Sequence, residues 1–485
     1  MATLRREERI EHLLRRAAFG AGQDELGSFI ELGSFGTLQF LLDYETQPDD
    51  LDDAIGIPGY VGVTARGEFL PNTSITDARQ RWLFRMVHSQ RPLQEKMALF
   101  WHNHFATAYS KVGGAFGAEV GAQMMAANPR TDTAQVKGQV ELFRQYALGN
   151  FRDLVVEVAK DPAMLVWLDG RLNTRDRPQE NFGREVLELF TMGVGNYTED
   201  DIYSATRVFT GWNLRRAPGA SGVRYEFVYN AGQHDTSAKR FSFPIYPDGS
   251  STIPARPAAN GQQDGLDFIN AIVAHPATGR RLARKLWSFF VSELRPAPES
   301  WVDAVAGVFT TGGYQMKPVV RAVLTSAEFY SPENVFARYS WPVEFVIRAL
   351  KEAGWLGFSV QSALTPLANM GQQLFEPPDV NGWELGAGWF STSSMLARMN
   401  FASTVATNQR VAVRDLLKPF ARTPDALLAY VLDRLTARPF ERDARETLRE
   451  YLVAGRPWTG SDADLLVKGP GLVHLVMASP NYQAI

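Results

Sequence analysis

Apolar residues recur at every third or fourth position along most of this chain of 485 residues, which is the spacing of one face of an α-helix. In the segment that begins at Pro92, Met97 and Trp101 keep this spacing, and the proline suits the first turn of a helix. The pattern predicts helices at Ala78–Val87, Pro92–Ala108, Ala134–Ala147, Asn150–Lys160, Pro178–Met192, Asp200–Trp212, Gly265–Ala274, Gly279–Ser292, Ser300–Thr310, Lys317–Ser326, Trp341–Ala353, Ser391–Thr407, Pro424–Leu435, Arg442–Val453 and Ala463–Met477.

The alternation of polar and apolar residues that indicates a β-strand is rare in this chain. It occurs at Gly222–Tyr229, and we expect this strand to pair with Arg240–Pro244 as a small hairpin. Stretches rich in proline and glycine predict long loops at Gly249–Gly261 and Glu376–Gly388. The expected fold class is therefore mainly α: a large multi-helix globular core with one small β-hairpin and long Pro/Gly-rich loops.

The length of the chain is compatible with about two to four domains. We predict a main helical domain over residues 1–410, which includes the small β element near 222–244. A C-terminal helical subdomain is expected over residues 411–485, packed on the core.

The composition restricts the chemistry more than the fold. With seven histidines and no cysteine, the chain has no ligands for an iron–sulfur cluster or a zinc ribbon, and any metal ion needs nitrogen or oxygen ligands. A net charge of −3 disfavours a nucleic-acid partner. No apolar run is long enough for a membrane span, and the N-terminal residues lack the apolar core of a secretory signal, which favours the cytoplasm.

The first candidate for chemistry is the segment that contains His102, Asn103 and His104, near the end of a strongly apolar helix. Positions i and i+2 of a regular helix lie roughly 200° apart, so both histidines face one metal ion only if the helix ends or bulges between them. On a helix, Glu95 shares the face of His102 instead. Aromatic neighbours favour burial, so the alternative is that one histidine is a hydrogen-bonded core residue and the other is solvated.

A second candidate is a predicted helix face that carries Asn181, Glu185 and Glu188. Arg184 lies one turn from Glu180 and one turn from Glu188, so its guanidinium is expected to pair with either carboxylate. Such a face suits acid and base groups of an active site. An ordinary solvated face with surface ion pairs explains the same pattern.

The remaining candidates are the adjacent His234 and Asp235 and two tryptophans. His234 contributes to a common site only if it reaches the face of Glu185, and otherwise the pair is an exposed turn. Trp383, in the loop at 376–388, is either a core anchor or the aromatic wall of a pocket, and Trp212 is a further candidate for stacking on a sugar.

Several of these segments together resemble a family of bacterial proteins defined as domain of unknown function 1800 (DUF1800). The resemblance extends in order over nearly the whole chain, and the segments that carry it are Leu13–Gly20, Glu95–Phe105, Asp161–Asp169, Glu180–Gly193, Thr210–Trp212, His234–Asp235, His275–Thr278, Arg284–Phe290 and Gly371–Trp383. It implies relatives that are often exported and encoded near a sulfatase-like partner family. It implies no established reaction, but it places the histidine, glutamate and tryptophan motifs among the family's typical features.

The leading hypothesis is an enzyme with a centre of histidine and carboxylate groups, a metal-assisted hydrolase or oxidase. A divalent metal ion would be bound by His102, His104 and Glu185. The catalytic groups would be Glu185, Glu188, His234 and Asp235, and the substrate contacts would be Asn103, Asn181, Arg184, Trp212 and Trp383.

Two alternatives stay open at this stage. One is a metal-free acid/base enzyme that cleaves glycosides, in which carboxylates donate and accept the protons. The other is a non-catalytic protein that binds a carbohydrate or another protein through its tryptophans, with the histidine and glutamate groups as a buried structural network.

Overall fold

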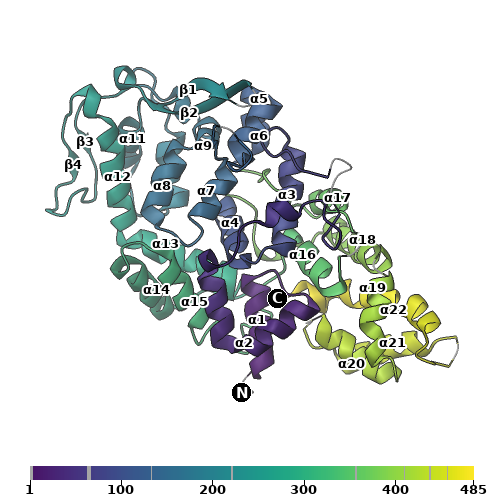
Figure 1. Cartoon of the computed structure of the whole chain (residues 1–485). Coiled ribbons are helices and arrows are strands. Elements are labelled where there is room, and N and C mark those ends of the chain that lie inside the picture. The colour runs from purple at the N-terminus through teal and green to yellow at the C-terminus, as the bar shows by residue number, and fades with distance from the viewer. Residues whose placement is uncertain are drawn as a thin grey trace.

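Two helices with almost no solvent-facing side lie at the centre of the fold: α4 (Pro92–His104) and α16 (Pro342–Ala353). Every residue of α16 is buried, and in α4 only Asn103 is not. A helix that is buried all round forms part of the core, and the two are joined by an ion pair between Lys96 and Glu344. The computed structural model (Figure 1) describes residues 4–62, 67–132, 134–219, 222–355, 358–408, 410–435, 438–455 and 457–485.

Helices surround this centre on several sides and account for most of the chain, which confirms the expected fold class. The other helices are α1 (Arg6–Ala17), α2 (Gln23–Leu42), α3 (Ile75–His88), α5 (Tyr109–Phe116), α6 (Ala118–Ala126), α7 (Gln139–Gln145), α8 (Phe151–Lys160), α9 (Pro162–Trp167), α10 (Asn181–Glu185), α11 (Glu199–Val208), α12 (Gln262–Ala274), α13 (Pro276–Leu286), α14 (Glu299–Thr311), α15 (Met316–Thr325), α17 (Gln361–Asn369), α18 (Thr392–Asn408), α19 (Arg410–Leu417), α20 (Pro424–Arg434), α21 (Arg442–Val453) and α22 (Asp462–Met477).

The small β elements form two separate antiparallel pairs. β1 (Trp212–Gly219) pairs with β2 (Gly222–Tyr229), and β3 (Lys239–Arg240) pairs with β4 (Thr252–Ile253). The predicted bounds of β2 are confirmed, but its predicted partner is wrong. Gly211 has a φ of +80°, which a helix does not accommodate, so the chain leaves its helical course before Trp212 and β1 pairs locally with β2.

Two predicted helices change their winding part-way. The helix expected over Pro178–Met192 begins only at Asn181, and after α10 the turns from Val186–Phe190 are π-helical. The same change follows α13, where Trp287–Val291 is π-helical. The periodicity did not reveal either change. Single π-helical turns are rare and occur often at functional sites, because they alter which carbonyl groups are bonded within the helix.

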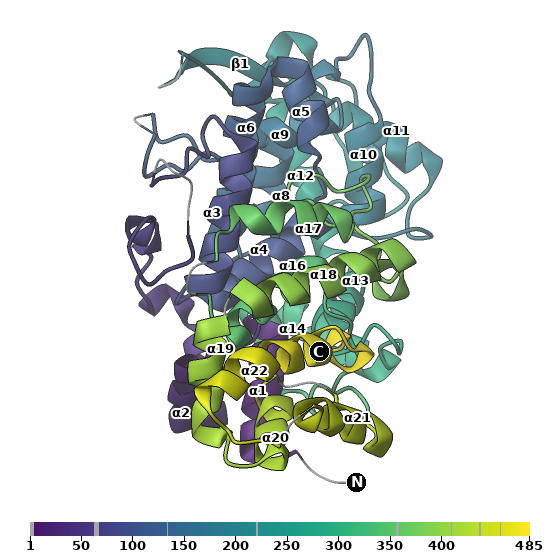
Figure 2. The ribbon, with the colours of Figure 1, turned by 90° about the vertical axis from the view of Figure 1, so that its right-hand side faces the viewer.

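The two ends of the molecule are formed by different kinds of element. The β1–β2 hairpin lies at one end and α20 at the other in both views (Figures 1 and 2). The last residues return to the centre, where the Tyr482 hydroxyl donates to Glu352 at 2.7 Å and Arg348 donates to the Tyr482 carbonyl at 3.1 Å. The predicted subdomain over residues 411–485 stays a prediction.

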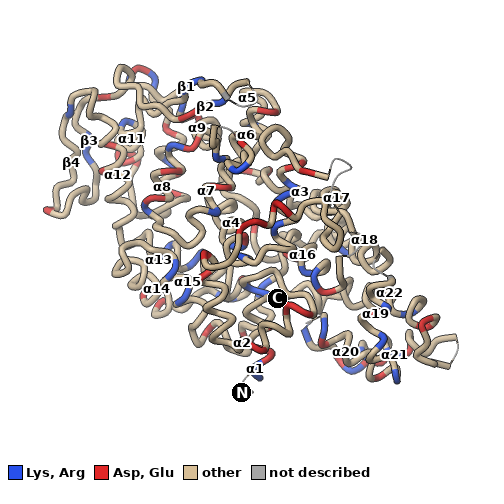
Figure 3. Tube along the Cα trace, in the orientation of Figure 1, with Lys and Arg blue, Asp and Glu red and all other residues tan. Residues whose placement is uncertain are grey.

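Charge is spread over the whole trace, with Lys and Arg interspersed among Asp and Glu (Figure 3). In the described part of the chain, no helix combines the length and the apolar character that crossing a membrane requires.

Candidate functional site

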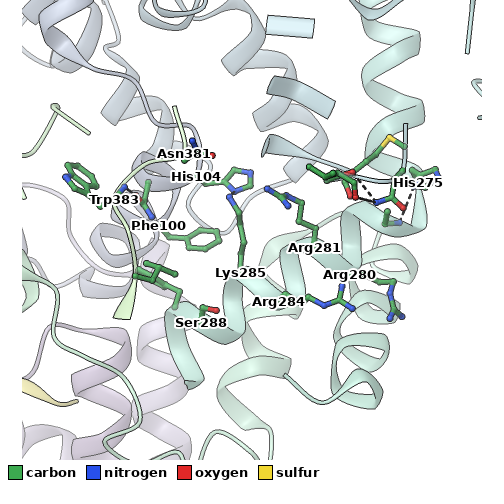
Figure 4. Close-up of a pocket in the computed structure, with 18 of the residues that line it drawn as sticks. Phe100, His104, His275, Arg280, Arg281, Arg284, Lys285, Ser288, Asn381 and Trp383 are labelled. Carbon is green, nitrogen blue, oxygen red and sulfur yellow. Dashed lines mark hydrogen bonds between the residues drawn. The ribbon is translucent and has the colours of Figure 1, made fainter. Parts of the chain in front are cut away.

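A cavity of about 730 Å³ lies between α4, α13 and several connecting segments, and we call it the α13 pocket (Figure 4). Its walls come from segments that are far apart in the sequence. The lining residues are Phe100, Asn103, His104, Met192, Gly193, Val194, Asn196, His275, Pro276, Ala277, Arg280, Arg281, Arg284, Lys285, Ser288, Phe289, Trp341, Asn381, Trp383 and Leu385.

The start of α13 is fixed by its first residues. The Nδ1 atom of His275 accepts a hydrogen bond of 3.2 Å from the Ala277 amide, and Pro276 occupies the first turn. One side of the helix is buried in the core through Leu282, Ala283 and Leu286. The four cations of the helix fall at positions that share the other side, and all four line the pocket: Arg280, Arg281, Arg284 and Lys285.

These four cations differ in how their charge is balanced. Arg280 pairs with Glu299 and Asp303, and Arg284 pairs with Glu299 at 2.8 Å. Among the described residues, no carboxylate oxygen lies within 4.0 Å of a nitrogen of Arg281 or Lys285. In the described part of the chain, the pocket wall therefore holds two cations that no carboxylate contacts directly.

Arg281 is oriented by the backbone of the π-helical segment that follows α10. Its Nε donates to the Leu189 carbonyl at 3.2 Å, and within the described chain its two Nη atoms make no hydrogen bond. Gly193, with a φ of +83°, leaves room beside it, since a Cβ there would lie 3.0 Å from Nη1. Burial lowers the pKa of Arg281, while the nearby Glu188 opposes that shift. The outer fork of the guanidinium is thus available to an anion.

Lys285 contacts His104, and the contact fixes which nitrogen of the imidazole carries the proton. The His104 Nε2 lies 3.0 Å from the Phe190 carbonyl, which only accepts, so Nε2 carries the hydrogen and Nδ1 accepts from the Lys285 ammonium at 3.1 Å. Burial drives the pKa of His104 well below its ordinary value, so the ring is neutral. Burial, with a further contribution from Arg281, lowers the pKa of Lys285 to about 7.

The opposite wall of the pocket is aromatic. Phe100 and Trp383 lie on one side of Lys285, and Arg281 and His275 lie on the other (Figure 4). The Trp383 amide donates to the Asn103 side-chain oxygen at 2.7 Å, which ties the loop 376–388 to the end of α4. The cavity thus offers an apolar face beside a cationic one.

Gly382→Ala tests how firmly this loop depends on its close approach to α4. Gly382 has a φ of +85°, and a Cβ there would lie 2.6 Å from the Asn103 carbonyl oxygen. We expect the variant to lose about 1–3 kcal/mol of unfolding free energy in urea titrations. Gly386→Ala is the matched control, since Gly386 has a φ of +72° and nothing lies within 4 Å of the added atom. Equal losses in both variants would contradict the role of the Asn103 contact.

Three of the residues singled out in the sequence line the α13 pocket: Asn103, His104 and Trp383. His102 does not. The helix continues regularly through the pair, and the His102 Nε2 accepts from the Phe375 amide at 3.1 Å, while burial lowers the pKa of its imidazole to about 3. The two histidines therefore contact different neighbours, as the angle between their positions predicts.

The predicted glutamate face is divided among different neighbours. Glu188 accepts from the Tyr197 hydroxyl at 2.7 Å, and burial, aided by Glu188, raises the pKa of the half-buried Glu185. Arg184 pairs with Glu199 at 2.9 Å and with Glu180 at 3.5 Å. A pair with Glu188, the other predicted partner, is not among the ion pairs of the described residues, because Glu188 turns to Tyr197. The remaining member, Asn181, donates to Asp169 at 3.3 Å.

The His234 segment belongs to another part of the fold. His234 is fully buried, with Nδ1 2.9 Å from the Thr210 carbonyl and Nε2 3.2 Å from an Asp264 oxygen. Asp235 pairs with Arg207 at 2.7 Å. Neither residue lines the α13 pocket, and the buried Trp212 does not line it either. In the described residues, no group of three His, Asp or Glu side chains is arranged to hold a metal ion.

Sequence reasoning missed the cations that give this pocket its charge. The signal was present in the run from His275 to Lys285, where a proline follows a histidine and four basic residues share one helix face. In isolation such a run is typical of a solvated surface helix. Only the tertiary structure, in which α13 and the end of α4 line the same cavity, shows that Arg281 and Lys285 face it.

The chain was compared with known families, curated proteins and solved structures. Residues 12–484 match the family described as protein of unknown function (DUF1800), so the chain belongs to this family. No curated protein and no solved structure matches the chain.

Proposed function

We propose that the protein is an enzyme whose substrate is a small organic anion, bound in the α13 pocket by Arg281 and Lys285. The observation that carries this proposal is that both cations face the cavity with no carboxylate of the described residues within 4.0 Å. A cation that is partly removed from water without a partner is costly, so an anionic ligand would stabilise this arrangement. The guanidinium fork suits a carboxylate, sulfate or phosphate group equally well.

The aromatic wall extends the proposal to the rest of the substrate. Phe100, Phe289, Trp341 and Trp383, all largely buried, contribute apolar atoms to the pocket wall beside the cations. Aromatic side chains of this kind accommodate a sugar ring or another ring with an apolar face. An acidic or esterified carbohydrate therefore combines the two features that the pocket presents.

The contacts support metal-free acid/base chemistry more than a metal-assisted reaction. His104 and Lys285 are hydrogen-bonded to each other at 3.1 Å in the pocket wall, which places the two groups within reach for proton transfer. A divalent metal ion stays a proposal with less support, because His102 and His104 contact different neighbours and Glu185 is not among the lining residues.

Removal of the Arg281 charge tests the proposed anion site. We expect the wild-type protein to bind inorganic sulfate, inorganic phosphate or glucuronate in calorimetric titrations, and the three probes distinguish the preferred acid group. Arg281→Gln is expected to weaken binding about tenfold, because a charge-assisted hydrogen bond contributes roughly 1.5–3 kcal/mol.

The matched control is Arg321→Gln, which removes a half-buried arginine on α15 outside the pocket. It is expected to bind the same anion with unchanged affinity. Wild-type protein that binds none of the three probes, or equal losses in the two variants, would contradict the proposed function.

A further inference from the structure

The surroundings of Lys285 suit an amine that acts as a nucleophile as well as a cation that binds an anion. Lys285 is half-buried in the wall of the α13 pocket, hydrogen-bonded to the neutral imidazole of His104, and one turn of α13 beyond Arg281. One N–H is directed to the His104 Nδ1 atom. In the tetrahedral amine, the remaining positions on nitrogen are then directed away from His104.

We propose that Lys285 forms an imine with the carbonyl carbon of an anionic aldehyde or ketone bound in the α13 pocket. This inference rests on the proposed function. The acid group of the substrate would pair with Arg281, and its carbonyl carbon would meet the Lys285 nitrogen. Side chains at i and i+4 of a helix are neighbours, at about 5–6 Å between their Cβ atoms. That spacing suits a 2-oxo acid, in which the carbonyl carbon is directly bonded to the carboxylate.

The reaction balances without a cofactor. The amine lone pair attacks the carbonyl carbon to form the carbon–nitrogen bond, and the oxygen becomes a hydroxyl as one N–H proton moves to it. Loss of that hydroxyl with the second N–H proton releases one water molecule and leaves the imine. His104 is positioned to relay these protons, because its Nδ1 atom already accepts from the Lys285 nitrogen at 3.1 Å.

The surroundings also supply the neutral amine that the attack needs. Burial and the neighbouring Arg281 lower the pKa of Lys285, which favours the neutral amine over the ammonium form. Desolvation beside a second cation is an established way to activate a lysine nucleophile. The charged and titratable groups that face Lys285 are Arg281 on its own helix and His104 on α4, with Glu188 beyond Arg281.

Reductive trapping tests the imine directly. The full-length protein is incubated with pyruvate, phenylpyruvate or 2-oxoglutarate and sodium cyanoborohydride at neutral pH, and the labelled lysines are identified by mass spectrometry of the digest. We expect at least one of the three acids to label Lys285 at least about tenfold faster than any other lysine in the same digest, because a surface amine is almost entirely protonated at this pH.

Three controls separate a specific imine from general amine reactivity. Acetone, which has the carbonyl but no acid group, is expected to label Lys285 no faster than other lysines. Arg281→Gln is expected to slow labelling by the acid about tenfold, because the acid loses its charge-assisted hydrogen bond. Lys285→Arg keeps the positive charge and is expected to abolish the label at position 285.

Sulfate binding, measured on the same preparation, shows which proposal fails. If sulfate binds but none of the three acids labels Lys285 preferentially, the imine proposal is overturned and the anion site stands. If none of sulfate, phosphate and glucuronate binds and nothing labels Lys285, both are overturned. Labelling by acetone as fast as by the acids would also overturn the imine proposal, since Arg281 would then play no part.

Discussion

Glu95→Gln is expected to lower the free energy of unfolding by about 3–5 kcal/mol. Glu95 lies on α4, is fully buried, and accepts from Trp82 at 3.0 Å, from Arg85 at 2.7 Å and from Arg144 at 2.9 Å. The glutamine keeps the size of the side chain and removes its charge. The buried guanidinium groups of Arg85 and Arg144 then lose the negative charge that Glu95 supplied. This loss lowers the free energy of unfolding more than the loss of one surface ion pair does.

Urea unfolding followed by circular dichroism measures this loss. Glu199→Gln is the matched control, because its carboxylate pairs with Arg184 at 2.9 Å on an exposed surface, and we expect little change there. If the two variants unfold at the same urea concentration, the buried pairs of Glu95 do not stabilise α4 as proposed. A large loss restricted to Glu95→Gln would show that the helix which carries Asn103 and His104 is held in place by buried charge.

Affinity for a sulfate ion is expected to fall about 100-fold between pH 6 and pH 9. The pKa of Lys285 is lowered to about 7, so the group loses its positive charge as the pH rises through that value. If the anion needs the ammonium form, each pH unit above the pKa weakens binding about tenfold. Sulfate is the suitable probe, since its own charge is constant over this range, and Arg281 remains charged throughout.

The variant Lys285→Met removes the titrating group and is expected to bind sulfate at least about 100-fold more weakly than the wild-type protein does at pH 6, with an affinity that no longer changes between pH 7 and pH 9. The pKa of His275, which also lines the pocket, is lowered by burial below 6.5, so His275 titrates outside this range. A pH dependence that persists in Lys285→Met would assign it to another group. A flat profile in the wild-type protein would contradict the role of Lys285 in anion binding.

The mainly helical fold was accessible from the sequence because its signal is local. An apolar face repeats within each helix, and proline at position 92 marks a first turn, so α4 was predicted with its correct start. The bounds of β2 followed from alternation in the same way. The partner of β2 was not predictable from alternation alone, because it depends on α11 ending at Val208 and on the turn at Gly211, after which β1 begins.

The separation of His102 and His104 was also determined by the sequence, because the angle between positions i and i+2 is a property of any regular helix. The family could be identified from the order of its motifs, and the match over residues 12–484 confirms it. The angle depends only on two residues that are close together along the chain, and the family assignment depends only on the order of the motifs.

The α13 pocket, by contrast, is decided by the tertiary structure. Lys285 and His104 are far apart in the sequence, and their contact at 3.1 Å exists only because the fold brings α13 and the end of α4 to the same cavity. The carbonyls of Leu189 and Phe190, at the end of the π-helical segment, lie against Arg281 and His104 and orient both side chains. The sequence by itself determined the helices and the residue types, whereas burial, which sets the charge state of Lys285, arises only when distant segments exclude water from one another.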